Sequence, residues 1–560
     1  MRSRPPRKAS PASAVIILQH WRLIGVRKGA SERAGVFRSC PEALFATGAL
    51  RRGMLGNDMI RPTLALLLAG TALLTSPAMA QQAAAPADQQ AQLEQLQQQV
   101  IELQKQIDAL KAATVKTTPQ TTPSWSGAPR LEDKEAGWSF KPRGRLMLDS
   151  GYVANPNDAV ATRNLGFATR VRRIRLGAEG TIPGGFGYKF EMDFANANVG
   201  FADVVVTYAP KNRPFDVTLG NFETLNSLEQ ITSSRFISFL ERSAFNEAFI
   251  NTRRLGVAVG LKNKPGDLRG SVGLFAAHSI DSTLDNDGWI AASRLVYSPK
   301  LGDQQLHFGV NAQHRDFASN NNGAPTSGAG SPSNGQLARY RARPFTQLTD
   351  VRFVDTGNFA AKSDTLVGIE AAGIVGPFHV TGEAQWTRVN AYAPGTRFSD
   401  PLDFFGAEPV TPSGDPTFFG GYVEAGYYLT GESRGYRDGL WNRTKVLKPF
   451  SKGGWGALQL NGRVEYLDLD SGKLKRAFAN NFVSGVATPS TNLSRGGQQL
   501  GLLTSLIWIP EDYFRLYLQY SYARITGGPL AGTVKPLSTA PLDERSYAVD
   551  SVQARASFDF

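Results

Sequence analysis

Residues 551–560 alternate strictly between apolar and polar side chains and end on an aromatic ring, which restricts the fold more than any other feature of this sequence. Successive side chains of a β-strand point to opposite faces, so a strand here would have one apolar and one polar face. Soluble sheets also show this alternation, but a terminal aromatic residue is typical of outer-membrane barrels, which carry aromatic girdles. The apolar positions are Val552, Ala554, Ala556, Phe558 and Phe560, and the polar positions are Gln553, Arg555, Ser557 and Asp559.

The same alternation recurs many times after about Trp138, in short runs separated by Gly, Asn, Asp and Pro. About 420 residues, at roughly 26 for a strand and its connection, correspond to about 16 strands, enough to enclose a water-filled channel. A β-propeller is the soluble alternative, but we find no repeat of about 40 to 50 residues. We therefore expect an all-β protein, a 16-stranded antiparallel transmembrane β-barrel over residues 138–560, with residues 320–336 as an external loop. Clear examples of the alternation are residues 188–194, 254–262, 307–315 and 514–521.

The N-terminal part has the features of an export signal. A short basic segment is followed by the apolar stretch 64–74, which is too short to span a bilayer, and by an A-x-A cleavage site at residues 78–80. We expect a signal peptide over residues 59–80 and a bacterial outer-membrane location. Residues 1–58 would then be an over-extended, disordered N-terminus, and a genuine cytoplasmic extension is the alternative.

Removal of residues 1–80 changes what the net charge implies. The whole chain has a formal charge of +13, but residues 1–80 contain 12 Lys or Arg against 3 Asp or Glu, which leaves about +4 on the rest. A strong polyanion-binding charge is therefore lost, and we expect no nucleic-acid partner. Cys40, the only cysteine, is lost as well, so disulfide and thiol chemistry are not expected.

Residues 81–113 are rich in Gln and Ala and carry apolar side chains at alternating spacings of three and four residues. This heptad pattern predicts a short periplasmic coiled coil, with a lone amphipathic helix as the alternative. The coiled coil would offer a periplasmic or cell-wall contact. Residues 114–137, rich in Pro, Thr and Ser, are expected to be a linker. The seam consists of Leu93, Leu96, Val100, Leu103, Ile107 and Leu110.

Four arginines cluster in the segment TRVRRIRLGAEG. If Ile174 and Leu176 face lipid, Arg173 and Arg175 face the lumen, because an arginine facing the middle of the bilayer costs about 2–4 kcal/mol. Arg170 and Arg172 would then lie on the lipid side near a rim, where long side chains reach the interface. The same alternation places Arg145, Arg254, Arg269, Arg294, Arg315, Arg463, Arg515 and Arg555 inside the barrel.

These inward arginines suggest a path for the passive uptake of small anions such as phosphate or polyphosphate, because the guanidinium group stays charged and donates paired hydrogen bonds to phosphate or carboxylate. The alternative is a general, weakly selective porin whose arginines are neutralised by carboxylates on the same face. Those carboxylates are Glu191, Asp193, Asp203, Glu370, Glu383, Glu424 and Glu465.

The connection 222–252 is long, partly helical and moderately apolar, which favours a loop that folds into the lumen and narrows it. A loop packed on the wall, with only structural polar residues, is the alternative. Its candidate donors at the constriction are Ser233, Ser234, Arg235 and Arg242.

These segments resemble the phosphate-selective porin O and P family over most of residues 138–560. The resemblance is carried by RRIRLGAEG with YKFEMDFAN, LEQITSSRFISFLERSAFNEAF, RRLGVAVG, RARP with VDTGNF, and YVEAGYYLTGESRGY. It implies a homotrimeric, 16-stranded outer-membrane porin, surrounded by lipid, with an inward third loop. Phosphate-specific members have a lysine in that loop, whereas this chain has none between Asn212 and Leu261. The resemblance also implies that Arg173, Arg175, Asp203, Ser233, Ser234 and Arg242 lie near the constriction.

Other classes of protein are less consistent with the sequence. After residue 80 the histidines are few, and His307 and His314 would lie on opposite faces of one strand, about 23 Å apart. The sequence contains no G-x-S-x-G, H-E-x-x-H or His/Cys metal spacing, so we expect no enzyme activity, no metal and no cofactor. A structural anchor that uses the coiled coil as a periplasmic tether is the remaining alternative.

Overall fold

The computed structural model describes most of the chain after residue 86. The expected signal peptide, the segment 1–58 and the expected external loop 320–336 lie outside the described residues. The described residues are 87–117, 124–125, 127–161, 164–195, 199–280, 288–317, 337–394, 396, 410–481, 486–489 and 496–560.

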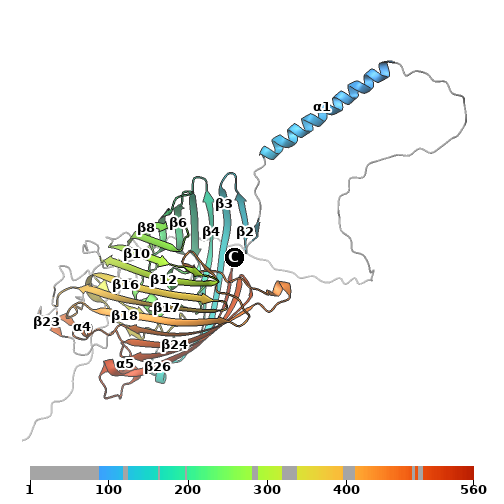
Figure 1. The fold of residues 1–560 in the computed structure, drawn as a ribbon. Helices are drawn as coiled ribbons and strands as arrows, with labels where there is room; N and C mark the ends of the chain where they lie inside the picture. The colour runs from blue at the N-terminus through green and yellow to red at the C-terminus, as the bar shows by residue number, and fades with distance from the viewer. Residues whose placement is uncertain are drawn as a thin grey trace, which may run out of the picture. The chain divides into compact units, whose positions relative to one another are not determined.

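Residues from Trp138 onward form a closed antiparallel β-barrel (Figure 1). Each strand pairs with the next along the chain, and the last strand pairs with the first, so the predicted 16-stranded barrel is confirmed. The whole sheet contains 20 strands, of which four are short additions: β1 (Ser124–Trp125), β2 (Pro129–Asp133), β11 (Lys300–Leu301) and β13 (Leu337–Ala338). The barrel strands are β3 (Trp138–Val153), β4 (Gly166–Ile182), β5 (Phe186–Asp193), β6 (Gly200–Tyr208), β7 (Phe215–Glu223), β8 (Arg253–Lys262), β9 (Leu268–Ala276), β10 (Trp289–Tyr297), β12 (Gln304–Asp316), β16 (Phe359–Val375), β17 (Phe378–Ala391), β18 (Thr417–Tyr428), β21 (Ala457–Asp468), β24 (Gln498–Glu511), β25 (Phe514–Thr526) and β26 (Ser546–Asp559).

The barrel has an apolar outer face and a polar inner face. On β26, Val552 is 50% exposed, whereas its neighbour Gln553 is 2% exposed and Arg555 is buried. Exposed apolar residues and buried polar residues reverse the usual order of a soluble protein, as expected where lipid replaces water around a barrel. The alternation of the last strand therefore predicts its two faces correctly.

Strand β4 contains a β-bulge that corrects one prediction. Met147 on β3 pairs with Arg173, but Leu148 pairs with Val171, so Arg172 is the extra residue. A bulge places two consecutive residues on one side and reverses the alternation that follows. The Arg172 guanidinium accordingly donates two hydrogen bonds of 2.8 Å to Glu241 inside the barrel, and Arg170 donates to the Gln347 carbonyl at 2.8 Å. The prediction that Arg170 and Arg172 face lipid is therefore wrong.

The N-terminal part of the described chain is a single helix, α1 (Ala87–Thr117). It covers all described residues of the predicted segment 81–113 and continues to Thr117, while residues 81–86 lie outside the described residues. Its apolar seam is exposed in this single chain, from Ile107 at 44% to Leu110 at 66%. The coiled coil thus stays a prediction. Within the expected linker, β2 pairs with β3 and extends the sheet. No helix among the described residues is both long and apolar enough to cross a bilayer.

Three connections fold into the barrel. Because the barrel strands alternate in direction, residues 224–252 and 337–358 enter from one end, and residues 429–456 enter from the other. Phe249 of the first packs edge-on against Tyr340 of the second, with ring centres 6.1 Å apart. The short elements of these three connections are α2 (Leu228–Ile231), α3 (Ala244–Phe249), β14 (Arg341–Ala342), β15 (Val354–Asp355), β19 (Tyr436–Arg437) and β20 (Leu440–Trp441), with a turn of 3-10 helix at Phe450–Lys452. Other connections contain α4 (Gly472–Lys475), β22 (Phe478–Asn481), β23 (Val486–Pro489) and α5 (Ala531–Val534), with turns of 3-10 helix at Pro156–Asp158 and Leu542–Glu544.

Candidate functional site

Residues 224–252, which we call the inward loop, cross the lumen and attach to the far wall. The backbone N–H groups of Leu228 and Glu229 donate to the Glu383 carboxylate on β17, both at 2.9 Å. The Ala244 N–H donates to Glu465 on β21 at 2.8 Å. Buried backbone donors need partners, and the wall carboxylates supply them. The inward fold expected for this connection is therefore present, and the loop fills the side of the lumen next to β17–β26.

Arginines of the wall also hold the inward loop. Glu241 accepts hydrogen bonds from Arg172 at 2.8 Å and from Arg555 at 2.8 Å. Burial alone would raise the pKa of Glu241, but Arg172 and Arg555 outweigh burial and lower it below its usual range. The carboxylate therefore stays charged. Arg463 is buried against Glu229 of the loop, and Arg515 donates to the Arg235 carbonyl. Arg463, Arg515 and Arg555 lie inside, as predicted, but they anchor the loop.

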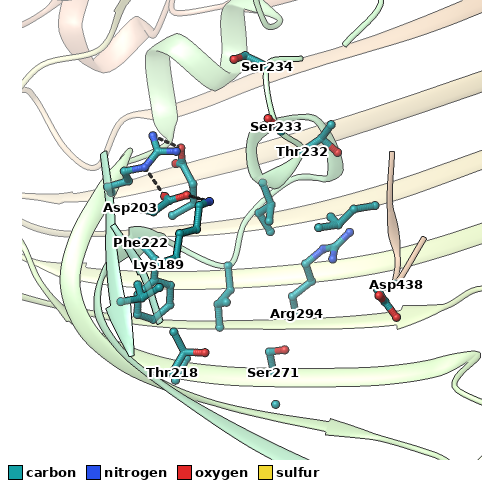
Figure 2. A pocket seen from close by; sticks show the side chains of 18 of the residues that line it. Lys189, Asp203, Thr218, Phe222, Thr232, Ser233, Ser234, Ser271, Arg294 and Asp438 are labelled. Carbon is teal, nitrogen blue, oxygen red and sulfur yellow. Dashed lines mark hydrogen bonds and ion pairs between the residues drawn. The ribbon is translucent and has the colours of Figure 1, made fainter. Parts of the chain in front are cut away.

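A cavity of about 480 Å³ remains between the inward loop and the wall formed by β3–β10 (Figure 2). Thr232, Ser233 and Ser234 border it from the loop, and Thr218 and Ser271 border it from the wall. The charged residues that line it are nine bases, Arg145, Arg173, Arg175, Lys189, Arg235, Arg242, Arg253, Arg269 and Arg294, and four acids, Asp203, Asp216, Glu223 and Asp438.

Several of these bases are neutralised by carboxylates fixed on the wall. Arg175 binds Glu191 at 2.9 Å and Asp193 at 2.7 Å. Arg294 binds Glu370 at 2.6 Å. Arg253 donates to Asp203 at 2.6 Å and also reaches Glu223 at 2.8 Å, while Lys189 is the second partner of Asp203. Asp203 thus lines the cavity as a shared counter-ion of two bases.

Arg173 and Arg242 differ from these bases because neither has a carboxylate within 4 Å in the described part of the chain. Arg173 contacts the sulfur of Met147 at 3.5 Å, and its Nε is buried without a hydrogen-bond partner there. Arg242 donates only to the carbonyl oxygens of Glu229, at 3.0 Å, and of Thr232, at 2.9 Å. Carbonyl and thioether groups carry no net charge, so no direct ion pair neutralises either guanidinium group beside the cavity, and Glu223 and Glu229 attract Arg242 only at longer range.

Arg145, which lines the same cavity as Arg173 and Arg242, binds the serines of the loop. It donates to Ser234 Oγ at 2.8 Å and to Ser233 Oγ at 3.3 Å, and Glu191 lies 3.8 Å away. Arg235 donates to the same Ser233 oxygen at 3.2 Å. A hydroxyl has one proton to donate, and these arginines occupy its lone pairs. The Ser233 and Ser234 hydroxyl protons are therefore available to an acceptor in the cavity, which suits an anion.

The structure separates the predicted site residues into two groups. Arg254 and Arg315 do not line the cavity: Arg254 donates to the Ala277 carbonyl at 2.9 Å, and Arg315 is paired with Asp364. Arg253 lines the cavity where Arg254 was expected to do so. Arg253 is the first residue of β8, so its side chain is not bound by the regular alternation of that strand. Sequence analysis also missed Lys189 and Asp438. The residues that do line the cavity are Arg145, Arg173, Arg175, Arg269, Arg294, Asp203, Ser233, Ser234, Arg235 and Arg242.

Comparison with known proteins agrees with this architecture. Residues 140–530 match the family model of the phosphate-selective porins O and P. The chain is 34% identical over 462 residues to an uncharacterized protein of Caulobacter vibrioides, a match that covers 80% of both chains. It is 28% identical over 334 residues to Porin O of Pseudomonas aeruginosa, covering 54% of this chain and 67% of that protein.

A solved structure, the outer-membrane channel DcaP of Acinetobacter baumannii, is similar to this chain with a TM-score of 0.41 and 13% identity. That match covers 76% of this chain and 98% of the other. Since the family model spans well over half of the 560 residues, this chain belongs to the phosphate-selective porin O and P family and is a β-barrel porin of the bacterial outer membrane.

Proposed function

We propose that this porin conducts small anions in preference to cations. Nine basic and four acidic residues line the cavity between the inward loop and the wall, and the carboxylates Glu191, Asp193, Glu370 and Asp559, which pair with lining arginines, reduce the excess of positive charge to one. In a narrow channel with low-dielectric walls, fixed charge of one sign attracts counter-ions and repels ions of the same sign. The excess therefore favours entry of anions.

The observation that carries this proposal is the state of Arg173 and Arg242. A guanidinium group that is already bound to a carboxylate adds little to the electric field in the pore. Among the described residues, Arg173 and Arg242 contact only uncharged groups, so their positive charge acts on passing ions. With Arg145, Ser233 and Ser234 next to them, they supply both charge and hydrogen-bond donors to a passing oxyanion. This combination supports transient binding of phosphate or a similar small anion.

The inward loop does not support strict selectivity for phosphate. The inward loop has no lysine, and arginine and serine also bind other oxyanions. We propose a pore for small anions with phosphate among them. We also propose a homotrimer, lipid around the apolar outer face, and α1 as a coiled-coil contact between copies or with a periplasmic or cell-wall partner.

Planar-bilayer recording tests the proposal. A porin gives stable conductance steps, and added phosphate should reduce the chloride current as it occupies the arginine site. A protein that serves only as a structural anchor would give no discrete steps. A weakly selective pore would give steps that phosphate does not affect, which would contradict a phosphate-binding path.

A further inference from the structure

Asp438 borders the cavity near Arg294, at the tip of the hairpin formed by β19 and β20 (Figure 2). The two residues of the turn, Asp438 and Gly439, have φ angles of +55° and +78°. Two consecutive left-handed residues form a type I′ turn, for which Asp-Gly and Asn-Gly are preferred. The sequence and the backbone thus agree on a tight, preorganised tip.

The body of this hairpin is fixed to its surroundings. The Tyr436 hydroxyl lies 2.6 Å from His307 Nδ1 on β12. The Arg434 guanidinium stacks on Trp441, with 3.8 Å between its carbon and the ring centre. At the tip, the Gly439 carbonyl accepts a hydrogen bond from Arg294 at 3.4 Å. The side chain of Asp438 is therefore the part of the hairpin that can move without repacking.

The Asp438 carboxylate is shared between two arginines. One oxygen lies 2.8 Å from Arg269 Nη2, and the other accepts from Arg437 Nε at 3.1 Å. The Asp438 side chain is 57% exposed and that of Arg437 is 75% exposed. Arg269 is mostly buried, and its Nε has no hydrogen-bond partner in the described ranges. Asp438 is thus a loosely held ligand of a well-placed arginine.

The neighbouring pair Arg294–Glu370 shows the opposite arrangement. Glu370 projects from the wall strand β16, its side chain is 0% exposed, and Arg294 binds it through two nitrogens. A passing anion cannot displace a carboxylate that is buried and fixed on the wall. An exposed ion pair is much weaker, because water competes for both partners. Of these two arginines on the cavity, Arg269 is the one that can exchange its partner.

We propose that Asp438 is a tethered competitor of the permeant anion. In the empty pore its carboxylate occupies Arg269, and a small oxyanion must displace it in order to bind there. The displaced carboxylate keeps Arg437, so that no charge is left buried without a partner. The proposal rests on the proposed anion preference and adds a residue that sets how tightly the pore holds anions.

Asp438→Asn tests this proposal with inorganic phosphate as the probe. Asn-Gly also forms type I′ turns, so the hairpin is retained while the competing charge is removed. Asp438→Asn should lower the phosphate concentration that half-blocks the chloride current about two- to fivefold, the range expected when a weak exposed ion pair no longer competes.

Asp216→Asn is the matched control, because Asp216 lines the same cavity and no ion pair of its carboxylate is found among the described residues. It should shift the half-blocking concentration less than Asp438→Asn does. In an Arg269→Gln background, Asp438→Asn should have no further effect, which is the signature of a direct pair.

Equal shifts in Asp438→Asn and Asp216→Asn would overturn the tethered competitor, because the effect would then be a general change of charge. An effect of Asp438→Asn that persists without Arg269 would overturn it as well. If the unmodified porin shows no phosphate block at all, the phosphate-binding path proposed above fails instead.

Discussion

Arg172 and Arg173 are consecutive in the chain, yet both guanidinium groups lie inside the barrel. Arg172 binds Glu241 of the inward loop, and Arg173 borders the cavity. A regular strand would send one of them into lipid, and the β-bulge at Arg172 avoids this. One strand therefore supplies both an anchor for the loop and a free charge for the pore.

Arg173→Gln and Arg242→Gln should each weaken the block of chloride current by phosphate. Each removes a charged donor that has no carboxylate to neutralise it, and a hydrogen bond to a charged group is worth about 1.5–3 kcal/mol. We expect the half-blocking phosphate concentration to rise about tenfold or more. Arg254→Gln removes the same charge outside the cavity and should leave the block nearly unchanged. Equal effects of all three variants would remove Arg173 and Arg242 from the path.

Glu241→Gln should loosen the inward loop. It leaves Arg172 facing a neutral amide and Arg555 with Asp149 as its remaining carboxylate, and breaking a buried ion pair typically costs about 3–5 kcal/mol. The free energy of unfolding in lipid vesicles should fall by about that amount, and the open-channel current should become noisier. Glu179→Gln is the control, because the Glu179 side chain is 37% exposed and its pair with Arg143 is expected to contribute under about 1 kcal/mol. A stable, quiet channel in the Glu241→Gln variant would show that other contacts hold the loop.

The lowered pKa of Glu241 predicts how the channel responds to acid. A carboxyl group whose pKa is lower in the folded state stabilises that state above its unfolded pKa, and this contribution disappears as the pH falls through the folded pKa. The anchor should thus persist well below the ordinary pKa of about 4.3 for glutamate. Glu383 and Glu465 hold the same loop, so the contribution of Glu241 is the part of the acid-induced noise that Glu241→Gln removes, and that part should appear only below about pH 4. A part that already appears at about pH 5 would contradict a charged Glu241.

Deletion of Arg172 should leave the barrel able to assemble. The deletion removes the extra residue of the bulge, so all remaining side chains of β4 still point to the same side of the barrel wall as before. Deletion of Val257 from the regular strand β8 should impair assembly, because half of that strand would turn its apolar face inward. The fraction of folded barrel on unheated gels measures both. Failure of the Arg172 deletion to assemble, with the β8 deletion tolerated, would contradict the assigned bulge.

Side-chain alternation predicts the barrel, its strand number and the faces of strands such as β26, because lipid outside and water inside impose a period of two. It fails at Arg170 and Arg172, because a bulge shifts the alternation by one residue and the sequence alone does not show where the shift occurs. It also fails at Arg253, since alternation is not yet established at the first residue of a strand.

Much of the site has no local signal. The inward loop could be expected from its length and apolar content, but the inward segments 337–358 and 429–456 were missed, as their sequences are not periodic. Arg555 binds Asp149 at 2.6 Å across the closing seam of the barrel, and Arg463 binds Glu229 across the lumen. Such pairs depend on which distant segments meet, so alternation alone could not distinguish these anchoring arginines from those on the cavity.

The most direct test of the central claim is the reversal potential of the unmodified porin in a planar bilayer with a KCl gradient. An excess of positive charge around the cavity predicts a potential displaced toward the equilibrium potential of chloride. A potential displaced toward that of potassium would show that the channel prefers cations and would contradict the account.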